Sequence, residues 1–241
     1  MSVDSVLRIQ DLLARHESWR SGCLNLTASE NVTSPLVRRL LVSDLLHRYA
    51  DYDLDPAQRK YRGTRYIESI EREVVGLAQT LFGARHVDIR PIGGHIACIA
   101  GLLAAVEPGD TVMEVSRDIG GHRTAAKFGR SSLFAYRTVY FPSDFAAYNI
   151  DVDRSVAMIR ELRPRVLVLG SSNFLFPHPV APLAEAAREV GAIVAYDGSH
   201  VLGLLAGGAF QDPLREGADI LMGSTHKTLP GPQGGIAMTN S

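Results

Sequence analysis

Short apolar runs alternate with amphipathic stretches over residues 86–241. Seven of these runs have the length of strands: 87–91, 111–115, 136–141, 165–170, 192–197, 218–223 and 234–239. Several are almost entirely apolar, as expected for strands that are covered on both faces. Helical stretches lie between them, at 93–110, 151–164 and 181–191. Strands that alternate with helices predict an α/β fold with a mostly parallel, doubly wound sheet.

Residues 1–85 have a different pattern, with three helical candidates and no convincing strand. The third candidate ends at Gly83, and its apolar residues recur at intervals of three and four: Ile67, Ile70, Val74, Leu77 and Leu81. Such spacing predicts a helix with one apolar stripe. The segment at 49–66 is rich in Tyr, Arg and Asp, and we interpret it either as a linker or as a substrate-facing loop. We therefore divide the chain into an N-terminal helical segment, 1–85, and a second domain, 86–241.

Composition and charge exclude several classes of protein. The chain has 241 residues, 46% hydrophobic and 21% charged, which is typical of a globular domain with a sizeable core. A net charge of −1 gives no reason to expect nucleic acid or an anionic membrane as partner. Cys23 and Cys98 lack CxxC spacing, so we expect reduced, packed thiols in a cytoplasmic protein. The charged N-terminus is not a signal peptide, and no apolar run is long enough to span a bilayer.

Polar residues gather directly after the predicted strands, where doubly wound sheets bind their ligands. The residues at these positions are Gly93, Gly94, His95, His122, Asn173, Asp197, His200, Ser224, Thr225 and Lys227. Singly, each has an ordinary explanation: an aspartate often forms a turn, and a lysine often lies in a solvated loop. Together they supply the parts of a pyridoxal phosphate (PLP) site: an amine, a carboxylate for the ring nitrogen, an aromatic ring and a phosphate cradle.

Six segments give the chain a family resemblance. They are LTASEN (26–31), KYRGTRYIESIE (60–71), LFGARHVDIRP (81–91), EPGDTVMEVSRDIGGH (107–122), AYDGSHVLGL (195–204) and STHKTLPGPQGG (224–235). In this order they resemble serine hydroxymethyltransferases, PLP enzymes of the large aspartate-aminotransferase fold group (fold type I). The resemblance covers nearly the whole chain. It implies that residues 86–241 are an incomplete PLP-binding large domain and that the small C-terminal domain is absent.

The resemblance also implies roles for individual residues. Lys227 would hold PLP as a Schiff base, Asp197 would pair with the pyridinium nitrogen, and His122 would stack on the ring. Further cofactor contacts are implied for Gly93, Gly94, His95, Asn173, His200, Ser224 and Thr225. Substrate contacts are implied for Ser29, Tyr49 and Tyr61, and proton transfer for Asp51. No metal ligands are expected.

The chain departs from the family pattern at the cofactor phosphate and on the substrate side. The family's Ser-Gly-Ser cradle is Gly93-Gly94-His95 here, so both hydroxyl donors are lost. Hydrogen bonds to a charged group contribute roughly 1.5–3 kcal/mol each, so we expect weaker PLP binding unless His95 or another chain compensates. Asp51 replaces a glutamate and is followed by about two extra residues, and Arg123 replaces a leucine. We therefore expect that the substrate is not simply serine, or that tetrahydrofolate is not the acceptor.

The family continues well beyond the position of Ser241. That continuation contains the rest of the large domain, the small domain and an arginine that binds the substrate carboxylate. A sheet that ends on residues 234–239 would have an unpaired edge and an uncovered apolar face. We therefore expect either a fragment or, as the favoured alternative, a split enzyme whose partner polypeptide supplies the C-terminal half. Family members form dimers, so a higher assembly is also expected.

Three functions follow as alternatives. The first is aldol or retro-aldol chemistry at Cα of a small amino acid, either hydroxymethyl transfer or a transaldolase reaction. The second is transamination or another reaction at Cα, which uses the same cofactor parts. The third is a non-catalytic scaffold subunit that binds a catalytic partner.

Overall fold

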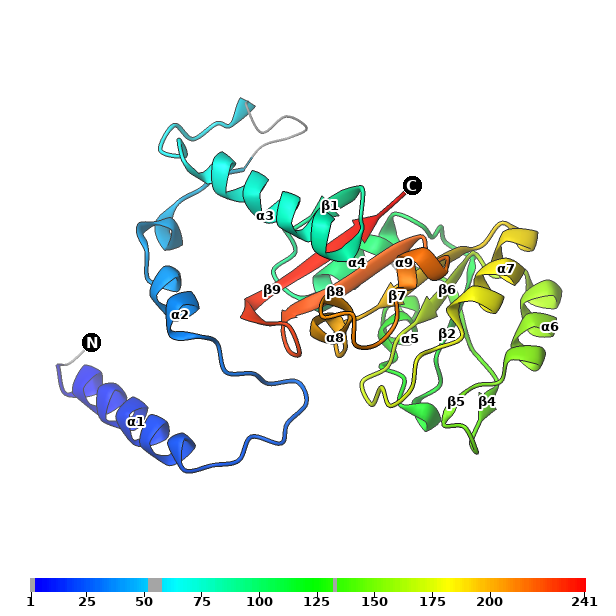
Figure 1. Cartoon of the computed structure of the whole chain (residues 1–241), viewed down its shortest axis with the longest axis horizontal. Coiled ribbons are helices and arrows are strands. Elements are labelled where there is room, and N and C mark those ends of the chain that lie inside the picture. The colour runs from blue at the N-terminus through cyan, green and yellow to red at the C-terminus, as the bar shows by residue number, and fades with distance from the viewer. Residues whose placement is uncertain (1–2, 52–57, 132–133) are drawn as a thin grey trace.

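The computed structural model describes residues 3–51, 58–131 and 134–241, and its centre is a seven-stranded sheet (Figure 1). Across the sheet the strands follow the order β1 (His86–Asp88), β9 (Pro230–Thr239), β8 (Ile220–His226), β7 (Ile193–Asp197), β6 (Val166–Leu169), β2 (Thr111–Glu114) and β3 (Arg137–Tyr140). The pairs from β8 to β3 are parallel, and β9 runs antiparallel to both β8 and β1. All seven predicted strands, and the mostly parallel α/β sheet, are confirmed.

Helices cover both faces of the sheet because neighbouring strand residues point to opposite sides. On one face Val112, Val168 and Met222 pack with α4 (Gly94–Leu103) and α5 (Thr124–Gly129). On the other, Met113 and Leu221 pack with helices that include α3 (Ile67–Phe82), α6 (Val152–Leu162), α7 (Val180–Val190) and α8 (Leu202–Ala206). The central strands are therefore apolar on both sides, as their sequences predict.

The helices α3, α6 and α7 begin and end where the sequence indicates, whereas α4 ends at Leu103 and not near residue 110 as predicted. The Asp151 side chain accepts a hydrogen bond from the backbone N–H of Arg154 and caps α6. Gly191 and Gly83 end α7 and α3 in the left-handed conformation. Short elements escaped prediction because they contain too few turns or residues for a periodic pattern. They are η1 (Asp44–His47), η3 (Arg117–Ile119), α5, α8, α9 (Pro213–Glu216) and the hairpin of β4 (Ser143–Asp144) with β5 (Asn149–Ile150).

The expectation of an unpaired edge at residues 234–239 is wrong. β9 lies between β8 and β1, and His86 to Asp88 pair with Thr239 to Ala237. The turn after α3 brings β1 back along β9, so the exposed edge is a strand of three residues. Asn240 also accepts a hydrogen bond from the backbone N–H of Arg85 at 2.7 Å. The division of the chain at residue 85 stays a prediction.

The helix α3 forms as predicted, but its apolar stripe does not face the sheet. Ile70, Val74 and Leu77 are exposed, whereas Ala78 and Phe82 are buried in the core. The helix is rotated so that its small and aromatic residues contact the sheet. A row of apolar side chains therefore has no cover within the described part of the chain.

An N-terminal arm extends away from the sheet (Figure 1). It carries α1 (Val3–Ser21) and α2 (Pro35–Leu41), and none of the residues of either helix is buried. Asn31 connects this arm to the β8–β9 hairpin by donating a 3.4 Å hydrogen bond to the carbonyl of Gly231. Cys23 lies on this arm and is only partly covered, whereas Cys98 is buried; both thiols are free. Within residues 3–51, 58–131 and 134–241, no helix has the length and apolar character that a membrane span requires.

A buried histidine makes the fold sensitive to acid. The ring of His178 lies 3.0 Å from Asn149 Oδ1 through Nδ1 and 3.2 Å from Ser171 Oγ through Nε2. Burial lowers the pKa of His178 from 6.5 to about 3. Because the folded-state pKa is the lower one, the neutral ring stabilises the fold above pH 6.5, and this contribution is lost as the pH falls towards 3.

We expect His178→Gln to remove part of this sensitivity. Each pH unit below the unfolded pKa costs about 1.4 kcal/mol, so the wild type should lose about 2–3 kcal/mol more than the variant between roughly pH 7 and pH 4.5. Urea unfolding at both pH values measures the difference. A matched change at the exposed His47, His47→Gln, should leave the wild-type pH dependence in place. Equal acid losses in His178→Gln and the wild type would show that the buried ring is not responsible.

Candidate functional site

One cavity brings together the chemically active side chains that follow the strands. Its lining includes Lys227, Asp197, His122 and His200, with Gly94, His95, Cys98, Thr124, Ser171, Ser199 and Ser224 completing the set. β7 and β8 are parallel neighbours, so their carboxyl ends deliver Asp197 and Ser224 to the same edge of the sheet. A bridge between Gly121 and Ser171 joins the loops that follow β2 and β6 at this edge.

The β8–β9 hairpin holds Lys227 at the cavity. Its strands run further than the apolar runs predict, with Ser224 paired to Gly235 and His226 to Pro230. Gly235 is needed here, because a Cβ at this position would lie 2.4 Å from the carbonyl oxygen of Gly93. The hairpin thus packs against the start of α4, and Lys227 follows directly after β8.

Lys227 and His200 form a hydrogen-bonded pair, with 3.2 Å between Nζ and Nε2. Burial lowers the pKa of Lys227. Burial and the neighbouring Lys227 charge lower the pKa of His200 to about 4. At neutral pH the imidazole is therefore uncharged, and its Nε2 accepts a hydrogen bond from the ammonium group. A lowered amine pKa increases the share of the neutral, nucleophilic form.

The other nitrogen of His200 is a donor without an acceptor. Nδ1 is buried and has no hydrogen-bond partner among the described residues. When Nε2 accepts from Lys227, the ring proton is on Nδ1. A buried N–H without a partner costs about 1–3 kcal/mol, so the site favours a ligand that carries an acceptor atom to this position.

Asp197 ends β7 with one carboxylate oxygen held by the backbone. Oδ1 accepts a hydrogen bond from the N–H of Ser199 at 3.0 Å. Burial, together with the nearby Asp197 carboxylate, raises the pKa of Cys98 well above its usual value. The thiol therefore remains protonated and does not act as a nucleophile.

His122 lies on a loop whose shape depends on glycine. A Cβ at Gly121 would lie 2.1 Å from the carbonyl oxygen of Val115, so no other residue fits. His122 Nδ1 is 2.6 Å from Thr124 Oγ1, and the ring meets that of His95 edge-on at 4.8 Å. Burial, as the largest cause, lowers the pKa of His122. The ring is thus uncharged at neutral pH and is positioned by two neighbours.

Two serine hydroxyls lie against the first turn of α4. A Cβ at Gly94 would be 2.1 Å from Ser224 Oγ and 2.9 Å from Ser199 Oγ. The two hydroxyls are 3.3 Å apart, and both serines are buried. The helix start therefore has hydroxyl donors beside it, supplied by other strands rather than by residues 93 and 95.

Replacing Gly94 by alanine should disturb this arrangement. The added methyl group would overlap Ser224, which is held in a strand, so we expect a loss of about 1–3 kcal/mol in the free energy of unfolding. Gly76 on α3 has nothing within 4 Å of an added Cβ, so Gly76→Ala should instead stabilise the helix by about 1 kcal/mol. Urea titration of the two variants tests this contrast. Equal effects of the two changes would mean that Gly94 is not closely packed.

The structure does not bring every predicted residue to this cavity. Thr225 donates its hydroxyl to the carbonyl of Pro232 at 3.0 Å, and it is absent from the lining because strand side chains alternate. Asn173 is exposed and lines a neighbouring hollow together with His122. Ser29 is exposed on the N-terminal arm.

Tyr49, Asp51 and Tyr61 form a separate group. The two tyrosine rings are 5.3 Å apart, and Asp51 lies 3.9 Å from Lys60. Arg59 contacts the carbonyl of Ala50 and also pairs with Glu71 of α3, which ties this group to the helix rather than to the cavity. The extra residues after Asp51, and the centre of the predicted linker or substrate loop, fall in 52–57, outside the described residues. The roles of these residues stay predictions.

Several residues in or near the cavity were given no role from the sequence, although Ser171 and Ser199 stand among the polar residues that follow the predicted strands. Cys98 lies one helical turn after Gly94 and so shares its face, a spacing that could have indicated it. Ser171 and Ser199 follow β6 and β7, and Thr124 begins α5. Glu114 is buried within an apolar strand, and it accepts hydrogen bonds from the N–H groups of Ala125 and Ala126, each at 3.0 Å. Burial raises the pKa of Glu114 to about 7.

The side chains close tightly around the cavity. About 10 Å³ is free at its centre, room for roughly one water molecule. His122 separates this space from a hollow of about 410 Å³. The donors and acceptors match the groups of PLP, whereas a ring of that size requires a side chain such as His122 to rotate aside.

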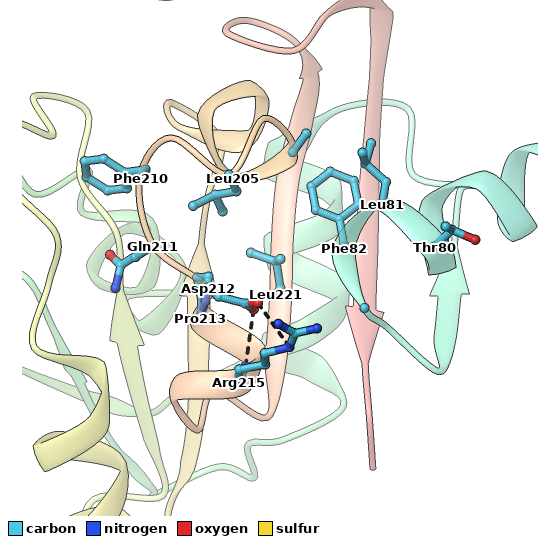
Figure 2. Close-up of a pocket in the computed structure, with 13 residues that line it drawn as sticks. Thr80, Leu81, Phe82, Leu205, Phe210, Gln211, Asp212, Pro213, Arg215 and Leu221 are labelled. Carbon is cyan, nitrogen blue, oxygen red and sulfur yellow. Dashed lines mark hydrogen bonds and ion pairs between the residues drawn. The ribbon is translucent and has the colours of Figure 1, made fainter.

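A larger hollow elsewhere in the structure has fewer reactive side chains in its lining. Figure 2 shows it between the end of α3 and the α8–α9 segment, with a volume of about 430 Å³. Phe82, Leu205 and Leu221 supply apolar walls, and Arg215 lies 3.4 Å from Asp212. It contains none of the predicted site residues. Among the described residues, no three His, Cys, Asp or Glu side chains are grouped to hold a metal ion.

Comparison with known proteins supports the same assignment. The family model described as serine hydroxymethyltransferase matches residues 3–241. The serine hydroxymethyltransferase of Methanothermobacter marburgensis is 48% identical over 235 residues, which cover 98% of this chain and 55% of the relative. That of Methanocella arvoryzae is 49% identical over 236 residues, covering 98% and 54%.

A solved structure is similar as well. The crystal structure of L-threonine transaldolase from Pseudomonas fluorescens, in its internal aldimine state, has a TM-score of 0.90 and 30% identity, and the match covers 99% of this chain and 54% of that one. The chain thus spans about half the length of the proteins it matches. By sequence and fold, the chain belongs to the serine hydroxymethyltransferase family, whose members are PLP-dependent transferases.

Proposed function

We propose that this chain carries the PLP-binding half of a transferase that makes or breaks the Cα–Cβ bond of a small amino acid. The observation that carries the proposal is the convergence of Lys227, Asp197 and His122 on one cavity. When bound, PLP supplies an electron sink for negative charge at Cα. Hydroxymethyl transfer and a transaldolase reaction are the two reactions that the family and the similar transaldolase structure favour.

Each residue has a task that its surroundings support. Lys227 would bind the cofactor aldehyde, and His200 would hold the Lys227 amine in place through the hydrogen bond between Nζ and Nε2. Asp197 keeps a proton on the ring nitrogen, and His122 lies against the ring. The start of α4 at Gly94, with the hydroxyls of Ser199 and Ser224 beside it, binds the phosphate. These two serines would offset the hydroxyls that the family has at positions 93 and 95.

The part of the relatives that this chain does not match would supply the rest of the site. The curated relatives are about twice as long, so we propose that a C-terminal half, continuous or separate, supplies the substrate-carboxylate arginine. Tyr49, Asp51 and Tyr61 do not line the cavity of their own chain, and we assign them to the site of a second copy. The exposed arm and the uncovered stripe on α3 provide apolar surface for such an assembly.

A non-catalytic scaffold is the second candidate, because the cavity is narrow and about half of the relatives' length is unmatched. Against it stand the amine, the counter-carboxylate and the neutral histidine, which a scaffold has no reason to hold together. The residue changes at Asp51 and Arg123 argue against tetrahydrofolate as the acceptor.

Product analysis separates these functions. The protein is mixed with PLP, alone and with any polypeptide that co-purifies with it, and then given serine, threonine or α-methylserine with and without tetrahydrofolate. We expect yellow protein and release of an aldehyde from the amino acid. A keto acid instead of an aldehyde would indicate transamination. Colourless protein under both conditions would contradict the proposal and support the scaffold.

A further inference from the structure

A cationic hollow adjoins the Lys227 cavity on the other side of His122. It has a volume of about 410 Å³, within the range of small-molecule sites. Arg117, Arg123 and Lys127 line it, together with Gly120, Gly121, His122, Ser172 and Asn173. No role is assigned to this cluster of cations by the proposed function.

The hollow and the cavity share one wall. His122 lines both. Residues that are adjacent in sequence line different spaces. Thr124 lines the cavity and Arg123 the hollow, and likewise Ser171 lines the cavity and Ser172 the hollow. The N–H of Ser172 donates to the carbonyl of Gly120 at 2.8 Å, which fixes the two loops to each other. The Lys227 cavity and the cationic hollow therefore adjoin each other at His122.

The three cations are not neutralised within the described part of the chain. None of Arg117, Arg123 and Lys127 forms an ion pair with a described carboxylate. Arg123 Nε is buried and has no hydrogen-bond partner among the residues that the structure describes. A guanidinium group that is partly removed from water in this way needs an acceptor.

Nearby acidic groups leave the hollow positively charged. Glu114 lies behind His122 and Arg123, but it is held by two backbone N–H groups and supplies at most one negative charge. The carboxylate of Asp118 accepts a hydrogen bond from Ser116 and does not line the hollow. At least two of the three positive charges are therefore available to a ligand.

We propose that this hollow binds the carboxylate or phosphate of an acidic substrate whose reacting end lies at Lys227. The inference rests on the proposed function for the reacting end, whereas the anion site itself depends only on the three cations. Two guanidinium groups can each offer a pair of N–H donors to oxygens of a planar or tetrahedral anion. The replacement of the family's leucine by Arg123 fits an acidic ligand better than an apolar one.

Calorimetric titration with succinate, and with uncharged succinamide as its matched probe, tests the site. The measurements use the whole chain at low ionic strength, where charge attraction is least screened, both without PLP and after its addition. Inorganic phosphate is the second anion, and it is titrated into the PLP-treated protein. The variants are Arg117→Leu, Arg123→Leu and Arg123→Lys, with the exposed Arg154→Leu of α6 as control. Circular dichroism confirms that each variant is folded.

We expect succinate or phosphate to bind and succinamide not to bind. Arg117→Leu and Arg123→Leu should each weaken anion binding about tenfold or more, Arg123→Lys should weaken it less, and Arg154→Leu should not change it. The proposal is overturned if neither anion binds, if succinamide binds as tightly as succinate, or if the leucine variants bind like the wild type. Succinate binding to protein that takes up no PLP would support the anion site while contradicting the proposed function, so the two can fail separately.

Discussion

Replacing Lys227 by alanine is expected to abolish the covalent uptake of PLP. The amine of Lys227 is the one that lines the cavity with Asp197 and His122, and it is the amine whose pKa burial lowers. Surface lysines remain protonated at neutral pH and react weakly. After incubation with PLP and removal of excess, the visible absorbance of the wild-type protein should be missing from the variant.

Lys227→Arg is the matched control for this change. It keeps the positive charge beside His200 but carries a group that stays protonated and does not react with an aldehyde. Both variants should therefore be colourless, while their unfolding curves remain close to that of the wild type. A variant that takes up PLP as fully as the wild type would show that another lysine, such as Lys127, is the reactive one.

Replacing Asp197 by alanine should leave some PLP bound but abolish turnover. The charged hydrogen bond to the ring nitrogen contributes roughly 1.5–3 kcal/mol, so PLP should bind about ten- to a hundredfold more weakly. Turnover should fall further, because an unprotonated ring is a weaker electron sink. Absorbance titration with PLP measures the first effect, and aldehyde release from the amino acid measures the second.

Asp197→Asn separates charge from shape at this position. The amide oxygen can still accept from the N–H of Ser199, as Oδ1 does now at 3.0 Å, but it cannot keep a proton on the ring nitrogen. We expect Asp197→Asn to fold like the wild type and to lack turnover. Full turnover in either variant would refute the role of Asp197 in charge stabilisation.

The fold was largely predictable because its central strands are buried on both sides. Runs such as Val166–Leu169, with all four residues buried, have no other plausible place in a globular protein. The hairpin beyond Ser224 was not predictable from apolar pattern, because glycines and prolines dominate it. It forms because Gly235 allows close contact with Gly93 and because β1 pairs with the far side of β9.

Residues of the candidate site could be predicted only where a reactive side chain lies in the segment that follows a strand. Asp197, His122 and Lys227 were found because parallel strands deliver their carboxyl ends to one edge. Cys98 and Thr124 reach the same cavity from helices, and Glu114 reaches its vicinity from inside an apolar strand. Their partners depend on packing between elements that are distant in sequence. The arrangement of Tyr49 with Tyr61, away from Lys227, depends on tertiary contacts in the same way.

Two serines from elsewhere in the chain lie beside the turn that lacks the hydroxyls of the family's phosphate cradle. The sequence shows the loss of hydroxyls at positions 93 and 95, whereas the structure places Ser199 and Ser224 against Gly94. The side chain at position 95 is now a ring that meets His122 edge-on. We therefore expect this change in the first turn of α4 to affect both the contacts to a cofactor phosphate and the support of the His122 ring.

The most direct test of the account is to locate the covalent link itself. The wild-type protein is incubated with PLP, treated with borohydride to fix the link, digested and analysed by mass spectrometry. We expect the added mass of the reduced cofactor to be confined to the peptide that contains Lys227. Modification at Lys60 or Lys127 to a similar extent, or no modification at all, would contradict this expectation.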